Sequence, residues 1–86
     1  MILIDAKRES AFVDGVEVHL TGAEWDVIQA FVEHQGAVVT AAAIAEACYL
    51  TPEYIKVHIH NLRVKLGTGA ITTNFGHGYI FEGALR

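Results

Sequence analysis

The first twenty residues alternate between apolar and polar positions in a way that predicts short β-strands. Residues 2–4 (Ile-Leu-Ile) form a β-prone run, and residues 11–13 (Ala-Phe-Val) lead into Asp14-Gly15, a strong two-residue hairpin signal. Residues 16–20 then alternate valine or leucine with glutamate or histidine, so one strand face is apolar. We expect this segment to form a small antiparallel sheet of about three strands.

The next segment carries the pattern of an amphipathic helix. Thr21 and Glu24 have the spacing of a capping box, in which the threonine hydroxyl and the glutamate carboxylate each accept from the other's backbone amide. Apolar residues then recur at three- and four-residue steps, at Trp25, Ile28, Phe31 and Val32. Gln35-Gly36 is a suitable helix end.

Two further helix starts follow along the chain. Thr40 precedes an alanine-rich stretch, residues 41–48, which predicts a short helix with small side chains. Thr51 is a good N-cap, and Pro52 fits the first helical position. This third helix, residues 51–66, is expected to stop at Gly67.

The third helix has two distinct faces. Its apolar stripe steps by four, three and four residues through Ile55, Ile59, Leu62 and Leu66. At about 100° per residue, the opposite face carries Glu53, Val57, His60, Asn61 and Val64. Lys56 and Arg63 flank one edge of this face, while His58 and Lys65 flank the other.

The last part of the chain predicts a β-hairpin. Residues 71–73 and 79–81 are strand-like, and Gly76 and Gly78 lie between them at positions where a turn requires a positive φ. A sheet, three helices and a hairpin in this order are the layout of a winged helix-turn-helix. We therefore predict one α+β domain over residues 1–86, with the sheet in 1–20, the three-helix core in 21–66 and the wing in 67–86.

Composition limits the class of protein. The chain has 86 residues, is 52% hydrophobic and holds one cysteine, so neither intrinsic disorder nor a disulfide-stapled secreted fold is expected. It has no apolar run of membrane-spanning length, and residues 1–10 lack the layout of a signal peptide, which predicts a cytoplasmic protein without a membrane partner.

The formal net charge of −4 is unevenly distributed along the chain. Residues 1–49 hold eight acids and two bases, which gives −6, whereas residues 50–86 hold four bases and two acids, which gives +2. An anionic partner is therefore expected to meet the C-terminal part of the chain.

Two ordered motifs in that part resemble a known family. Residues 57–66 (VHIHNLRVKL) are similar to the V-H-I-x-x-L-R-x-K-L recognition helix of the OmpR/PhoB-type winged-helix DNA-binding domains, and residues 71–81 (ITTNFGHGYIF) are similar to their wing. Upstream, Asp14-Gly15, residues 20–24 and residues 36–40 also resemble the family's pattern. The resemblance implies a four-stranded N-terminal sheet, three helices, a C-terminal wing, and DNA-binding regulation of transcription.

The chain departs from the family's pattern in three places. The family's domain usually follows a receiver domain, for which 86 residues leave no space, so a stand-alone effector or an excised fragment is expected. The loop at residues 49–51, whose counterpart often contacts RNA polymerase, is shorter than usual. His60 and Asn61 stand where the family often has a basic pair, and Phe75 stands where its wing often has arginine.

These residues define a candidate surface for double-stranded DNA. In the third helix, Val57 or Val64 would contact a thymine methyl group and Asn61 would pair with adenine, with His60 on the same face. Lys56, Arg63 and Lys65 would lie near phosphates. In the wing, the candidates for the minor groove or the phosphates are Thr72, Thr73, Asn74, Phe75 and His77. The alternative for the helix is an ordinary solvated face, and the alternative for Phe75 is packing against the core.

A second function class remains open. The acidic residues Asp14, Glu17, Glu24, Asp26 and Glu33 would form a surface that, on the same scaffold, binds a transcription factor or a polymerase subunit.

Catalysis is not expected, because the sequence has no nucleophile with partners and no phosphate-binding glycine loop. No cofactor or metal is expected, since His58 and His60 diverge by about 200° on a helix. A small domain of this kind would bind DNA tightly only as two copies.

Overall fold

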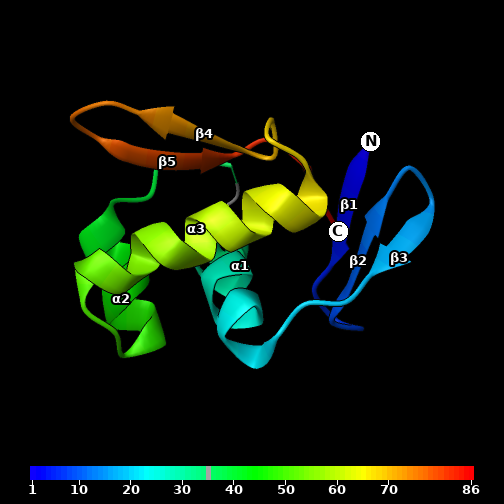
Figure 1. Cartoon of the computed structure of the whole chain (residues 1–86), viewed down its shortest axis with the longest axis horizontal. Helices are drawn as coiled ribbons and strands as arrows, with labels where there is room; N and C mark the ends of the chain where they lie inside the picture. The colour runs from blue at the N-terminus through cyan, green and yellow to red at the C-terminus, as the bar shows by residue number, and fades with distance from the viewer. Residues whose placement is uncertain (35) are drawn as a thin grey trace.

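The computed structural model describes residues 1–34 and 36–86, and it has the predicted order of sheet, three helices and hairpin (Figure 1). The elements are β1 (Ile2–Asp5), β2 (Ser10–Val13), β3 (Val16–Val18), α1 (Gly22–His34), α2 (Ala41–Cys48), α3 (Pro52–Leu66), β4 (Ile71–Asn74), β5 (Gly78–Phe81) and β6 (Ala84–Leu85). Within the described ranges, none of the three helices is both long and apolar enough to cross a membrane. The winged-helix prediction is confirmed.

The N-terminal sheet has four strands in the order β3-β2-β1-β6. The first three are antiparallel, and Asp14 and Gly15 make the predicted hairpin with φ values of 50° and 83°, which suit a type I′ turn. The fourth strand comes from the far end of the chain, where β6 pairs in parallel with β1, so that Leu3 lies opposite Ala84. Segment 67–86 therefore supplies both the wing and the last strand of this sheet.

The apolar face expected for residues 16–20 is only partly present. Leu20 is buried and Val18 is half-buried against the core, but Val16 is exposed. The expectation is wrong at Val16 because β3 is an edge strand and this residue directly follows the turn.

The helix starts follow the predicted caps, with one difference. The amide of Thr21 donates to Glu24 Oε1 at 2.8 Å and the amide of Glu24 donates to Thr21 Oγ1 at 3.3 Å, which completes the capping box. Thr40 Oγ1 accepts from the amide of Ala43 at 3.0 Å. Thr51 occupies the N-cap of α3, but its hydroxyl caps no amide. The predicted end of α1 at Gln35-Gly36 lies partly outside the described residues, because only Gly36 is described there.

The core lies between the three helices, the inner face of the sheet and the base of the wing. The predicted stripe of α3, from Ile55 to Leu66, is fully buried. Ile4 of β1, Phe31 of α1 and Phe81 of β5 join it, with the two phenyl rings 5.9 Å apart between centroids. The sheet and the wing are thus joined to α3 through one continuous apolar cluster.

The wing is held against the body of the protein at β5. The backbone groups of Tyr79 and Val39 exchange two hydrogen bonds of 2.8 Å, which attaches β5 to the segment between α1 and α2. Gly78, beside this contact, has φ of 145°, and a Cβ there would lie 2.7 Å from the carbonyl carbon of Val39. Only glycine allows the two backbones to approach this closely.

Candidate nucleic-acid interface

The outer face of α3 forms an uncovered ridge. Val57 is 55% exposed and Val64 is 71% exposed. His60, which lies between them, is also exposed, as is Glu53 at the start of the helix. Asn61 is half-buried on the same face. The other face of the helix is fully buried. The two exposed valines are therefore available for contact with an apolar group of a partner.

The three basic residues expected near phosphates have different surroundings. Lys56 is exposed, and within the described residues no hydrogen bond or ion pair engages its ammonium group. Arg63 is half-buried and donates to the wing, to the carbonyl oxygen of Ile71 and to Thr73 Oγ1. Lys65 Nζ lies 2.6 Å from Glu24 Oε1 of α1. The sequence-based expectation grouped these three cations, whereas the structure gives two of them protein partners.

Glu24 is the buried partner of Lys65 and lies at the start of α1. The residue is 4% exposed, and its carboxylate also accepts from the amide of Thr21. Burial raises the pKa of Glu24, but the hydrogen bonds from Lys65 and Thr21 and the positive charge of Lys65 outweigh burial and leave that pKa below its ordinary value. Glu24 is therefore a structural carboxylate, and the expectation that it belongs to an acidic surface is wrong.

The loop of the wing projects from the body. Phe75 is 88% exposed and His77 is exposed, while Asn74 is half-buried. The alternative that Phe75 packs against the core is therefore wrong. The two wing threonines point to opposite faces of β4, because Thr73 accepts from Arg63 and Thr72 Oγ1 donates to Glu82 Oε2 at 2.6 Å.

Two exposed tyrosines were not among the sequence candidates. Tyr49 ends α2 in the left-handed conformation, with φ of 57°, and is 96% exposed, while Tyr54 in the first turn of α3 is 60% exposed. Helical spacing would have indicated Tyr54, since it lies one turn before His58 and two turns before Asn61. No local pattern indicates the exposure of Tyr49, which depends on the short turn between the two helices.

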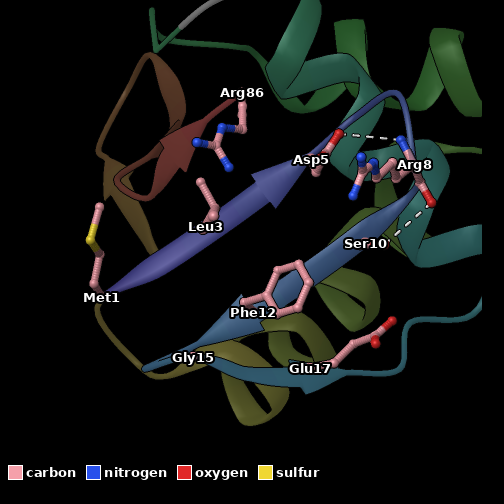
Figure 2. A pocket seen from close by; sticks show the side chains of 9 residues that line it. All are labelled: Met1, Leu3, Asp5, Arg8, Ser10, Phe12, Gly15, Glu17 and Arg86. Atoms are coloured by element: carbon pink, nitrogen blue, oxygen red, sulfur yellow. Dashed lines mark hydrogen bonds between the residues drawn. The ribbon is translucent and has the colours of Figure 1, made fainter.

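A concave surface lies on the outer face of the N-terminal sheet (Figure 2). This hollow of about 540 Å³ has Leu3 and Phe12 at its floor, with Asp5, Arg8, Glu17 and Arg86 around them. The Arg8 amide donates to Asp5 Oδ1 and Ser10 Oγ donates to the Arg8 carbonyl oxygen, at 3.2 and 3.3 Å, which shapes the β1–β2 turn. Because acids and bases alternate here, the face does not favour a partner of one charge sign.

The chain is similar to transcription regulators over most of its length. Residues 15–81 match the family described as "Transcriptional regulatory protein, C terminal". Two curated relatives are the transcriptional regulatory proteins QseB of Escherichia coli O157:H7, 29% identical, and of Haemophilus influenzae, 30% identical, each over 83 residues. The match covers 91% of this chain and 38% of each relative, so the chain spans little more than a third of their length.

Solved structures share the same fold. The DNA-binding domain of the response regulator AdeR, in complex with an intercistronic region, superposes with a TM-score of 0.77 at 21% identity, covering 95% of this chain and 94% of that one. The Klebsiella pneumoniae RstA DNA-binding domain, in complex with the RstA box, gives 0.77 at 25%, covering 91% and 87%. The DNA-binding domain of CpxR from E. coli gives 0.73 at 32%, covering 94% and 89%. Together with the match over residues 15–81, these likenesses show that the chain belongs to the family of transcriptional regulatory protein C-terminal domains, the OmpR/PhoB-type winged helices.

Proposed function

We propose that this domain binds double-stranded DNA in a sequence-specific way and thereby regulates transcription. The observation that carries the proposal is the uncovered ridge of α3, with β4 of the wing hydrogen-bonded along its side. An exposed helix of 15 residues can enter the major groove, which is about 12 Å wide. We infer that the domain acts by binding and not by catalysis, and that it acts in the cytoplasm, where its DNA target would lie.

The chemistry of each candidate side chain suggests its contact. Val57 and Val64 are suited to thymine methyl groups, and the amide of Asn61 is suited to adenine N6 and N7. His60 lies beside them on the ridge. In the wing, Phe75 and His77 would approach the minor groove or the backbone, and Asn74 would follow them.

Free positive charge is scarce on this surface. Among the Lys and Arg residues of α3 and of strands β4 and β5 within the described part, only Lys56 has a side chain that makes no hydrogen bond or ion pair with the protein. Because each neutralised phosphate contributes about −0.9 to the slope of log K against log[salt], we expect a slope of about −1 to −2 for each bound copy. Fluorescence anisotropy between 50 and 200 mM KCl measures this slope, and a slope steeper than about −5 would contradict the assignment of partners.

Weak electrostatics has a consequence for assembly on DNA. With few phosphate contacts per copy, a single domain would bind too weakly to find its site. We propose that two copies bind repeated half-sites, spaced by about one turn of the duplex. Half-site DNA should then bind far more weakly than DNA carrying both half-sites.

The central test compares two lysine variants of the protein. It measures their affinity for DNA that has been selected from a random library. Lys56→Ala is expected to lower affinity about three- to tenfold on every sequence and to reduce the salt slope by about 0.9, since it removes a phosphate contact. Lys7→Ala is the matched control, because it removes the same charge from the turn between β1 and β2. Equal losses in both variants would mean that only net charge matters and would overturn the assignment of α3 as the DNA-binding helix.

The exposed tyrosines favour a second candidate function. Tyrosine is enriched in protein–protein interfaces, and the exposed Tyr49 and Tyr54 lie on either side of the turn between α2 and α3. A regulator protein or an RNA polymerase subunit would be the partner on this alternative. Capture of such a partner that survives nuclease treatment and is lost in Tyr49→Ala would support it.

A further inference from the structure

The guanidinium group of Arg63 is hydrogen-bonded to the wing. Its Nε and Nη2 donate to the carbonyl oxygen of Ile71 at 3.0 and 2.8 Å, and Nη2 also donates to Thr73 Oγ1 at 2.9 Å. Three of the five N–H groups of the side chain are thus directed at β4, which leaves the pair on Nη1. The guanidinium group therefore lies against β4 and does not extend into solvent.

The wing needs such contacts because it is a two-stranded hairpin. Hairpins of two strands are marginally stable by themselves. Here β5 is fixed by the two hydrogen bonds between Tyr79 and Val39, and β4 is fixed by Arg63. Figure 1 shows the hairpin lying along α3, with the segment that precedes α2 reaching β5.

We propose that Arg63 is a positioning residue that clamps the wing to α3, so that helix and wing present a single rigid surface to DNA. The inference rests on the proposed DNA-binding function and deepens it. Arg63 acts through Ile71 and Thr73, and its charge is not used to contact a phosphate. Pre-organisation of this kind lowers the entropy that binding would otherwise cost.

Three variants separate a clamp from a phosphate contact. Arg63→Lys keeps the charge but loses the planar fork, and Thr73→Val keeps the shape of the strand but loses the acceptor. If Arg63 is a clamp, each of these lowers DNA affinity about three- to tenfold with an unchanged salt slope, and Arg63→Ala behaves in the same way. The double variant Arg63→Lys/Thr73→Val should bind no more weakly than Arg63→Lys alone, since the bond that Thr73→Val removes is one of the three made by the guanidinium group.

The opposite outcome has a distinct signature. If Arg63 contacts a phosphate, Arg63→Ala reduces the slope by about 0.9, Arg63→Lys retains most of the affinity, and Thr73→Val is neutral. That pattern would overturn the proposal. Lys56→Ala serves as the reference, because it shows how much the salt slope falls when one phosphate contact is lost.

A measurement without DNA keeps the inference independent of the proposed function. Hydrogen exchange of the free protein should be faster at the amides of β4 and β5 in Arg63→Lys and in Thr73→Val, with α1 unchanged. Unchanged exchange in the wing of both variants overturns the clamp even if DNA binding is observed. If the natural protein binds no DNA while wing exchange responds, the clamp is supported and the proposed function is the part that fails.

Discussion

Gly78→Ala is expected to destabilise the protein by at least about 2 kcal/mol and to detach the wing from the body. The φ of 145° is one that residues with a Cβ rarely adopt, and the added carbon would lie 2.7 Å from the carbonyl carbon of Val39 and 2.8 Å from Thr40 Cα. These atoms are backbone, so they cannot rotate away as a side chain would. The backbone contact between Tyr79 and Val39 must therefore break or shift.

Gly76 provides the matched control for this experiment. It also has a positive φ, 82°, but a Cβ there would meet no atom within 4 Å. Gly76→Ala should therefore cost only about 1 to 2 kcal/mol, the price of the left-handed conformation. Urea unfolding followed by circular dichroism compares the two variants, and an equal loss in both would show that the approach to Val39 is not what requires glycine.

Glu24→Ala is expected to lower the free energy of unfolding by about 2 to 3 kcal/mol, because it removes a helix cap and leaves Lys65 without its partner. The same carboxylate oxygen accepts from the Thr21 amide and from Lys65, so one substitution breaks both interactions. Thermal unfolding should shift downward by roughly 10 °C. Glu33→Ala removes an exposed acid of the same helix and should change stability by less than about 0.5 kcal/mol. A loss for Glu24→Ala no larger than that of Glu33→Ala would contradict the structural role.

The lowered pKa of Glu24 gives this contribution a defined pH dependence. Since the folded protein holds the Glu24 proton less tightly than the unfolded chain does, the stabilisation is complete above the ordinary glutamate pKa of 4.5. It is lost as the pH falls below that value, through the folded pKa. The stability difference between the natural protein and Glu24→Gln should therefore narrow from pH 6 to pH 3. Urea midpoints at fixed ionic strength measure it, and a difference that stays constant or grows on acidification would contradict this linkage.

Local patterns predicted the elements of this fold with few errors. The caps at Thr21 and Thr40, the stripe in α3 and the glycines of the wing are all short-range signals, and each lies where the structure has the corresponding feature. Strand β6 could not be predicted, because two residues are too few to show a period and their partner is at the other end of the chain.

The partners of charged residues were the part that the sequence could not reveal. Lys65 and Glu24 are 41 residues apart, and Arg63 and Thr73 are ten residues apart on different elements. A helical wheel places Arg63 and Lys65 correctly at the two edges of the exposed face. It does not show that the neighbouring element at each edge offers an acceptor, which is a property of the tertiary fold.

The pairing of β6 with β1 has a consequence for how the protein is made. Residues 2–5 are synthesised before residues 84–86, so the carbonyl oxygen of Ile4 can accept its hydrogen bond from the Arg86 amide only after that later segment has been made. Until then, one edge of β1 has no neighbour and is open to pairing with another nascent chain. Slow translation would prolong that exposure, so the yield of folded protein should depend on how quickly residues 84–86 are synthesised after β1.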